Sequence, residues 1–487
     1  MKKLFIEDVY CDSGVPKYTY IEPNEHVKTK VALRSKGRGV IVEGPSGIGK
    51  TTCIKKIIAD NNMSAEFLSA RIQADIEYIK LILSSPRNCG IVIIDDFHLL
   101  SDEIKHGFSD LLKVLADESS EDTKLVLIGI NKAGECLVQL APDLNNRIDT
   151  IRFEANPTEK LIELISKGED ALNIRIEKKK ELAERAFGSF HVIQMLCKAL
   201  CIINSITETQ ETCTSIKTLP DDAISNKMQE LGRVFNSTIK EFAVGNRNRR
   251  GGLAPYLRIL EWLAESSNGA IQMDDIYILH PKYKASISQI ADKGYITRLI
   301  QNNERISKVL YYDVASKILA IEDPKFLFYI KNTNWALFEK EMGFKISEHT
   351  QYDFAMSFAG EKRKYVEMLV NKLVASEVSV FYDKNAAVDI LGQDLDKYFA
   401  PIYAADAKYV VAMIDSNYPM KVWTVFESQN YKERFGENSV IPILFEDFTP
   451  SPMDILYNKG YERIDTTKEV EPQIERIATL LIKKLEH

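Results

Sequence analysis

The stretch from Gly44 to Thr51, which reads Gly-Pro-Ser-Gly-Ile-Gly-Lys-Thr, limits the folds that this sequence can adopt. It follows an apolar run at 39–42 and precedes a helical pattern at 52–60, so the pattern G-x-x-x-x-G-K-[ST] stands between an expected strand and an expected helix. Glycines let such a loop fold back so that its backbone N–H groups and the helix N-terminus hold a polyphosphate. The stretch therefore predicts a phosphate-binding loop, and a glycine-rich turn without nucleotide is the alternative.

Two side chains of this loop have expected parts in phosphate binding. Lys50 would reach the terminal phosphates, and Thr51 would offer its hydroxyl to Mg²⁺, which takes few protein ligands. The predicted nucleotide-binding segment is continuous along the chain and comprises Gly44, Pro45, Ser46, Gly47, Ile48, Gly49, Lys50, Thr51 and Thr52.

Further apolar runs predict the sheet that carries this loop. They recur between helical patterns at 65–68, 90–94, 125–130 and 150–153, which is typical of a parallel sheet with helices on both faces. The run at 90–94 ends in Asp95 and Asp96, and its continuous apolar character fits a central strand. Asp95 is expected to hold the Mg²⁺ shell and Asp96 to polarise an attacking water. An acidic strand end that only caps a helix is the alternative.

Two polar residues complete this pattern. Asn131 ends the run at 125–130, and Arg147 precedes the last strand. The order of phosphate loop, acidic strand, polar strand end and arginine resembles the AAA+ ATPases, within the wider STAND group of signal-transduction ATPases. The resemblance implies ATP as the ligand, Asn131 as the sensor and Arg147 acting on a neighbour's nucleotide. Fast hydrolysers usually carry Glu where Asp96 stands, and 188–191 shows no clear sensor arginine, so we expect slow hydrolysis that suits a switch.

The segments around this domain have more than one interpretation. The extended aromatic stretch 15–20 either covers the adenine or is an ordinary packed N-terminal arm. Apolar residues at helical spacing in 157–203 predict the lid helices. The Ser-, Thr- and Glu-rich stretch 204–222 predicts a loop or linker. The run 245–252, with Arg247, Arg249 and Arg250, is the most basic in the chain and favours a solvated linker over a phosphate-binding patch.

The middle region predicts helices followed by a hairpin. Helical patterns occupy 255–264, 273–278 and 284–293, and strands are expected at 295–299 and 307–312. This order looks like a winged helix. In switch ATPases such a module usually packs on the nucleotide domain as part of the lid, and DNA reading is the alternative.

Residues 350–487 predict a second α/β unit with a doubly wound, flavodoxin-like sheet. Strands are expected at 352–357, 378–383, 409–414, 440–445 and 461–464, and helices at 363–375, 395–405 and 470–485. The strand-end segments Ser357-Phe358-Ala359-Gly360 and Phe381-Tyr382-Asp383, with the W-x-x-x-E pattern from Trp423 to Glu427, resemble a TIR domain. In the NAD-cleaving branch of that family, the resemblance implies Glu427 as the catalytic carboxylate. It also implies NAD⁺ as substrate beside Phe358, Phe381, Asp383 and Trp423.

The chemistry of such a reaction suits these residue types. Cleaving nicotinamide from ribose builds positive charge on the sugar, which one carboxylate beside the ribose can stabilise. The i, i+4 spacing places Trp423 and Glu427 on one helical face, and aromatic rings would supply apolar or stacking walls. An exposed Glu beside a core Trp is the alternative, and a non-enzymatic TIR scaffold does not require Glu427.

The sequence thus predicts an α/β multidomain chain. The expected boundaries are 1–155 for an AAA+ nucleotide-binding domain, 156–250 for the lid and linker, 251–340 for a winged-helix-like domain and 350–487 for a TIR domain. The resemblance implies self-assembly through the ATPase and TIR domains, with the loop 384–394, including Asp389, Leu391 and Gly392, packing on a neighbour. It also implies an ATP-regulated NAD⁺ hydrolase of bacterial anti-phage or abortive-infection defence. A TIR scaffold and a DNA-binding AAA+ regulator are the alternatives.

Composition also bears on the expected partners and cellular compartment of the protein. The formal net charge of -7 does not favour broad nucleic-acid binding. The start of the chain turns acidic too early for a signal peptide, and no run of 18 apolar residues occurs, so we expect a cytoplasmic protein that does not enter membranes. The 7 cysteines contain no C-x-x-C pair, which argues against a disulfide framework.

Overall fold

The computed structural model describes residues 3–85, 88–118, 120–130, 147–246, 251–346, 351–358, 360–382, 402, 406–416, 439–450 and 460–486. The chain divides into two compact units. The first consists of Met1–Thr238, Glu261–Ile271 and Asn303–Thr333, and the second of Ile239–Leu260, Gln272–Asn302 and Asn334–His487. The phosphate loop belongs to the first unit, and the expected TIR domain belongs to the second.

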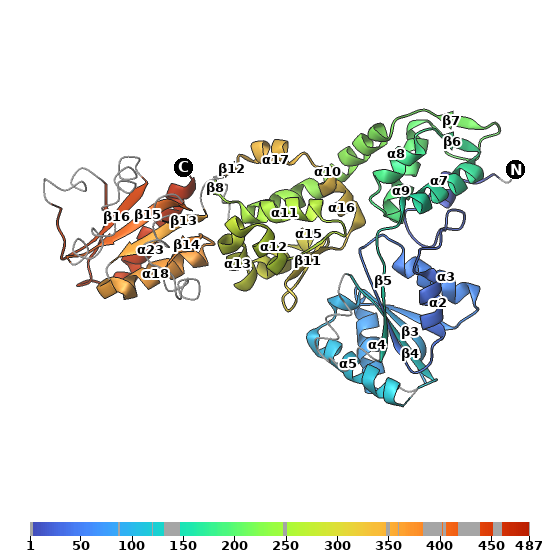
Figure 1. The fold of residues 1–487 in the computed structure, drawn as a ribbon, viewed down its shortest axis with the longest axis horizontal. Coiled ribbons are helices and arrows are strands. Elements are labelled where there is room, and N and C mark those ends of the chain that lie inside the picture. Colours follow the sequence, from blue (N-terminus) through green and yellow to red (C-terminus); the bar gives the residue numbers. More distant parts are fainter. Residues whose placement is uncertain are drawn as a thin grey trace. The chain divides into compact units, whose positions relative to one another are not determined.

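A parallel sheet lies at the centre of the nucleotide-binding region in the first unit (Figure 1). Its strands lie in the order β2-β3-β4-β1-β5, and their bounds are β1 (Gly39–Glu43), β2 (Ala65–Ser69), β3 (Gly90–Asp95), β4 (Thr123–Ile128) and β5 (Ile148–Arg152). Each neighbouring pair is parallel, as the alternating pattern predicted. The phosphate loop after β1 and the acidic end of β3 therefore lie at the same edge of the sheet.

Helices cover both faces of this sheet (Figure 1). One face packs against α4 (Gln73–Ser84) and α5 (Asp102–Asp117), and the other against α2 (His26–Arg34) and α3 (Lys50–Asp60). Along β3, Val92 and Ile94 belong to the first of these cores and Ile93 to the second. The strand is buried on both sides, which explains its continuous apolar sequence.

The predicted lid consists of α7 (Thr158–Leu172), α8 (Lys179–Glu184) and α9 (Phe190–Ile203). Between α7 and α8, the short strand β6 (Ile174–Ile176) pairs in parallel with β7 (Thr214–Ile216). Residues 204–222, which the sequence predicted as a loop or linker, thus contain the strand β7. Ile216 of β7 lies opposite Ile176 of β6, and both side chains are buried. The described residues before the middle region also form the helices α1 (Ile6–Val9) and α10 (Pro220–Val244), of which α10 is long.

In the middle region, α11 (Pro255–Glu265), α12 (Met273–Leu279) and α13 (Lys284–Asp292) confirm the predicted helices. The predicted position of the hairpin was wrong, because 295–299 belongs to the helix α14 (Tyr295–Gln301). Its buried residues Ile296, Leu299 and Ile300 recur at helical spacing, and Gly294, with φ +71°, precedes the helix. The assignment of the region as a winged helix stays a prediction.

The hairpin itself lies further along the chain. It is formed by the antiparallel strands β10 (Leu310–Asp313) and β11 (Ile318–Ile321), and β9 (Ala270–Gln272) extends this sheet beside β11. Short helices flank the hairpin and continue toward the C-terminal domain: α15 (Glu304–Ser307), α16 (Pro324–Lys331) and α17 (Trp335–Met342). Single turns of 3₁₀ helix occur at Phe97–Leu99, Pro281–Tyr283 and Gly360–Lys362.

The C-terminal domain contains a parallel sheet in the order β14-β13-β15-β16-β17, which confirms the predicted doubly wound fold. The strands are β13 (Tyr352–Phe358), β14 (Val380–Phe381), β15 (Ala407–Ile414), β16 (Val440–Phe445) and β17 (Glu462–Ile464). The helices α18 (Arg363–Ala375) and α23 (Val470–Glu486) pack on one face of the sheet. The predicted helix at 395–405 lies, apart from residue 402, outside the described residues.

A two-stranded pair also belongs to the second unit. It joins β8 (Gly251–Gly252) to β12 (Lys345–Ile346) in parallel. Across the described part of the chain, no helix has both the length and the apolar character that a bilayer-spanning helix needs.

Two adjacent leucines of α23 test this packing. Leu481 is 3% exposed in the core of the C-terminal domain, whereas Leu480 is 41% exposed. We expect Leu481→Ala to lower the free energy of unfolding by about 2–5 kcal/mol because it leaves a cavity. Leu480→Ala, the matched control, should change it by less than about 0.5 kcal/mol. Urea unfolding measures both, and equal shifts would contradict the packing of α23.

Candidate functional site

The phosphate loop joins β1 to α3 in a backbone conformation that requires glycine. Gly47 has φ +79° and Gly49 has φ +102°, both in the left-handed region that L side chains rarely adopt. A Cβ on Gly47 would also lie 2.6 Å from Cβ of Pro324. Both the turn and the close approach of a neighbouring segment therefore exclude a side chain there.

Lys50 begins α3 and folds back over the loop. Its Nζ donates hydrogen bonds to the carbonyl oxygens of Gly44 and Pro45, each at 2.7 Å. Burial lowers the pKa of Lys50 to about 8, and the charges of Asp95 and Asp96 oppose this shift only in part. A phosphate placed in the loop would offer the ammonium group a charged acceptor in place of these carbonyls.

Thr51 and Asp95 meet at the edge of the sheet. The Thr51 hydroxyl donates a hydrogen bond to Oδ2 of Asp95 at 2.9 Å. Burial and the neighbouring Asp96 together raise the pKa of Asp95, while the bond from Thr51 acts in the opposite direction. Oxygen ligands are the ones that Mg²⁺ prefers, so the hydroxyl of Thr51 and the carboxylate of Asp95 fit the Mg²⁺ ion that the sequence predicts there.

The beginning of α9 is attached to the phosphate loop. The Ser189 hydroxyl and the His191 N–H both donate to the carbonyl oxygen of Gly47, at 3.1 and 3.2 Å. The Asn156 side-chain amide donates to the carbonyl oxygen of Ile48 at 3.2 Å. The lid therefore holds the phosphate loop through hydrogen bonds to the carbonyl groups of the loop.

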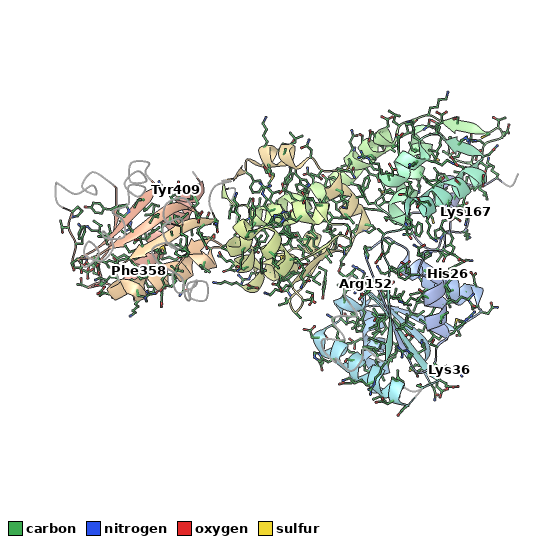
Figure 2. The ribbon with its side chains drawn as sticks, in the orientation of Figure 1. His26, Lys36, Arg152, Lys167, Phe358 and Tyr409 are labelled. Carbon is green, nitrogen blue, oxygen red and sulfur yellow. The ribbon has the colours of Figure 1, made fainter. Side chains whose placement is uncertain are left out.

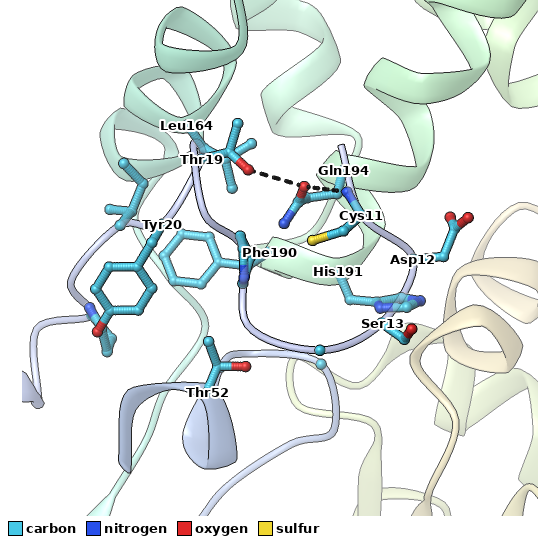
Figure 3. Close-up of a pocket in the computed structure, with 16 residues that line it drawn as sticks. Cys11, Asp12, Ser13, Thr19, Tyr20, Thr52, Leu164, Phe190, His191 and Gln194 are labelled. Carbon is cyan, nitrogen blue, oxygen red and sulfur yellow. Dashed lines mark hydrogen bonds between the residues drawn. The ribbon is translucent and has the colours of Figure 1, made fainter. Parts of the chain in front are cut away.

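A cavity of about 220 Å³ lies between the N-terminal segment, the phosphate loop and α9 (Figure 3). Tyr20, Phe190 and Thr52 are among its lining residues. Oε1 of Gln194 accepts hydrogen bonds from the Cys11 N–H at 3.1 Å and from the Thr19 hydroxyl at 3.2 Å, which fixes the N-terminal segment on α9. Aromatic walls with a few oriented polar groups are typical of small-molecule sites, and this favours the nucleoside-covering interpretation of the segment.

A second cavity, of about 450 Å³, borders the same loop. Its lining brings together most of the predicted nucleotide-binding residues, namely Ser46, Gly47, Gly49, Lys50, Thr51, Thr52, Asp95 and Asp96. Gly47, Gly49 and Thr52 border both cavities, so the two adjoin along the loop.

Two cations of this second cavity, Arg71 and Lys308, were missed by the sequence analysis. Arg71 follows β2 at the edge where β3 ends in Asp95, and the shared edge of parallel strands is a signal that could have identified it. Lys308 comes from the distant stretch after α15, and no local signal in the sequence indicates its position.

The positions of Asn131 and Arg147, the two remaining polar residues predicted for the nucleotide site, are not confirmed. Asn131 lies outside the described residues. Arg147 precedes β5, and its Nη2 lies 3.0 Å from Oδ1 of Asp117. The described lining of the second cavity does not include Arg147. Its action on a neighbour's nucleotide therefore stays a prediction.

In the C-terminal domain, the described part of the predicted NAD⁺ site is limited to aromatic residues. Phe358 ends β13 (Figure 2) and packs on the core beneath α18 and α23, whereas Phe381 belongs to the core on the opposite face of the sheet. The structure therefore does not bring these two rings together. Beside Phe358, the Tyr382 ring lies 5.8 Å away between centroids, and the Arg363 guanidinium carbon lies 5.1 Å from the Phe358 ring.

The remaining residues predicted for that site are Asp383, Trp423 and Glu427. All of them lie outside the described residues, as do Asp389, Leu391 and Gly392 of the loop expected to contact a neighbour.

A phosphate loop at the carboxyl edge of a parallel sheet, with a helical lid, defines the first domain as a P-loop ATPase, and the second sheet is a flavodoxin-like α/β domain. Comparison with known families makes both assignments more specific. Residues 40–154 match the family described as "ATPase family associated with various cellular activities (AAA)", and residues 354–481 match the TIR domain. The chain combines an AAA ATPase domain with a C-terminal TIR domain, as predicted.

A curated relative is similar in the TIR region. It is "3' cyclic ADP-D-ribose synthase AaTIR" from Aquimarina amphilecti, which is 36% identical over 138 residues. The match covers 28% of this chain and 40% of the relative, so the chain spans less than half of that protein's length.

Solved structures with similarity to this chain include P-loop proteins. The RuvB Holliday junction branch migration motor of Thermotoga maritima is 15% identical, with a TM-score of 0.34 over 68% of this chain and 100% of that chain. Cdc6p of Pyrobaculum aerophilum is 13% identical, with a TM-score of 0.35 over 69% of this chain and 98% of that chain. Neither score is high enough to bear on function.

The lowered pKa of Lys50 predicts that nucleotide binding depends on pH. In the protein without nucleotide, Lys50 loses its proton as the pH rises through about 8, whereas bound phosphates favour the ammonium form. Binding should therefore take up a proton, and the Kd for ATP should rise by up to about tenfold per pH unit above pH 8. Titration calorimetry of ATP binding in buffers of different ionisation enthalpy measures the number of protons that are taken up.

Lys50→Arg is the matched control for this prediction. An arginine stays charged throughout this range, so any nucleotide that the variant binds should show no proton uptake and a flat Kd. A Kd for the natural protein that is constant from pH 7 to about 10 would contradict the assigned role of Lys50.

Proposed function

We propose that this chain is a nucleotide-regulated NAD⁺ hydrolase, in which the TIR domain releases nicotinamide and the AAA domain controls when it does so. The observation that supports the enzyme most directly is the 36% identity to a cyclic ADP-ribose synthase over 138 residues of the TIR region. The W-x-x-x-E pattern from Trp423 to Glu427 lies inside the matched family region 354–481. Glu427 is our candidate for the catalytic carboxylate.

The proposed reaction breaks the bond between C1′ of the ribose and the nicotinamide nitrogen. The bonding electron pair goes to that nitrogen, which loses its positive charge, and charge builds on the sugar instead. The carboxylate of Glu427 would stabilise this charge through the ribose. A water oxygen then bonds to C1′ and releases its proton to solvent, which gives ADP-ribose. If a hydroxyl group of the same molecule replaces the water, the product is cyclic, and the relative's name makes this outcome worth measuring.

The AAA domain would supply the control. ATP with Mg²⁺ would occupy the two adjoining cavities, held by Lys50, Thr51 and Asp95. We propose that the nucleotide-bound form self-associates through the ATPase and TIR domains, so that the loop 384–394 of one copy meets a TIR domain of another. A chain that depletes NAD⁺ only on such assembly suits bacterial anti-phage or abortive-infection defence.

Nicotinamide release from NAD⁺ by the full chain, supplied with ATP and Mg²⁺, tests the enzyme. We expect Glu427→Gln to lower the rate by at least about 100-fold, because the neutral amide cannot stabilise the sugar cation. The exposed Glu469→Gln in the same domain is the control, and it should retain the full rate. Chromatography of the products separates linear from cyclic ADP-ribose.

Two results would overturn this assignment. A Glu427→Gln protein with the normal rate would exclude Glu427 as the catalytic carboxylate. No nicotinamide release by the natural protein under assembling conditions would exclude the enzyme and leave a TIR scaffold.

A further inference from the structure

A buried carboxylate from the hairpin region reaches the nucleotide-binding region within the first unit. Glu322 follows β11, and its side chain is only 2% exposed. Its Oε2 accepts a hydrogen bond from Nη2 of Arg71 at 2.8 Å, and its Oε1 lies 3.0 Å from Nε2 of His98. Burial alone would raise the pKa of Glu322, but the bond with His98 and the charge of Arg71 outweigh it and lower this pKa. Glu322 is therefore an ionised group that depends on its partners.

The same arginine also holds Asp96, the expected water-polarising carboxylate. Nε of Arg71 donates to Oδ2 of Asp96 at 2.6 Å, and Nη2 donates to Oδ1 at 3.3 Å. Asp96 has φ +57°, an uncommon conformation for a residue other than glycine. The planar guanidinium group of Arg71 thus bridges Asp96, which follows β3, and Glu322, which follows the hairpin. A lysine could not bridge the two carboxylates in the same geometry.

Apolar contacts place the hairpin on this corner of the nucleotide-binding region. The ring of His98 meets the ring of Tyr311 edge to face, with 4.9 Å between centroids. Ile130, which follows β4, packs with Ile318 and Ala320 of β11. The ion pair between Arg71 and Glu322 lies beside these contacts, so its loss would leave a buried charge at the place where the hairpin docks.

Arg71 also borders the second cavity, where Lys50 and Thr51 are expected to bind phosphates. The guanidinium group of an arginine has a fixed number of N–H donors, and phosphate oxygens are strong hydrogen-bond acceptors for them. Phosphates in this cavity would therefore compete with Asp96 and Glu322 for the same guanidinium group.

We propose that Arg71 is a positioning residue that holds Asp96 while Glu322 holds Arg71, and that a nucleoside triphosphate in the cavity draws Arg71 away from both carboxylates. This inference rests on nucleotide binding by the AAA domain. Release of Arg71 frees Asp96 for its expected role and leaves Glu322 with His98 alone, which weakens the docking of the hairpin. Occupancy of the phosphate cavity is in this way transmitted to residues 310–331.

Hydrogen exchange of the full chain, with and without the non-hydrolysable triphosphate AMP-PNP and Mg²⁺, tests this proposal. In the natural protein, AMP-PNP should speed exchange of the amides in Ile318–Lys331 by about tenfold. In Glu322→Gln, exchange in this segment should already be fast without nucleotide, and AMP-PNP should change it by less than about twofold.

A second variant keeps the test independent of how well Glu322→Gln folds. Lys in place of Arg71 keeps the charge but cannot bridge both carboxylates, so Arg71→Lys should give the same loss of nucleotide response. Glu169→Gln is the matched control, because Glu169 is also a buried carboxylate paired with a lysine, Lys179, yet it belongs to the lid and not to the described lining of the second cavity. This control can lower stability, but the response of Ile318–Lys331 to AMP-PNP should remain.

Calorimetry with AMP-PNP on the same preparations separates the possible failures. If the natural protein does not bind AMP-PNP, nucleotide regulation and this inference both fail. If it binds AMP-PNP and exchange in Ile318–Lys331 is unchanged, the inference alone is overturned. If Glu322→Gln and Arg71→Lys both respond as the natural protein does, Arg71 and Glu322 form only a structural ion pair.

Discussion

The first unit depends on how its phosphate loop is held from several sides. The loop has carbonyl groups to satisfy as well as N–H groups to offer, and the carbonyls of Gly44, Gly47 and Ile48 accept hydrogen bonds from Lys50, the start of α9 and Asn156. These bonds fix the backbone before a nucleotide arrives, so less order has to be gained on binding. They also make the lid part of the site, because a movement of α9 must break a bond to the loop.

The charges around the loop are closely matched. Three cations, Lys50, Arg71 and Lys308, line one cavity together with the carboxylates of Asp95, Asp96, Glu322 and Asp323. Lys50 bonds two loop carbonyls, Arg71 pairs with Asp96 and Glu322, and Lys308 pairs with Glu304. The arriving phosphates must therefore exchange partners with these cations rather than fill an empty positive pocket. Such an exchange changes which protein groups are paired, and this is the physical basis on which a bound nucleotide can alter the rest of the unit.

Local patterns in the sequence were enough to predict most of the fold. The phosphate loop, the strand ending at Asp95 and the strands of the TIR sheet each follow from a short motif or a run of apolar residues, which act at close range in the sequence. The helix at Tyr295–Gln301 was missed because a short apolar run fits a strand as well as a helix. The contacts of Arg71 with Glu322 and of Lys50 with its carbonyls could not be predicted in detail, because they depend on how distant segments pack and on which acceptor each cation finds.

We propose that nucleotide bound in the AAA domain controls NAD⁺ cleavage by the TIR domain of the same chain. The most direct test measures ATP binding and nicotinamide release on the same preparation across a range of ATP concentrations. We expect the two curves to rise together with a shared midpoint. Nicotinamide release that is constant from no ATP to full occupancy of the site would contradict it.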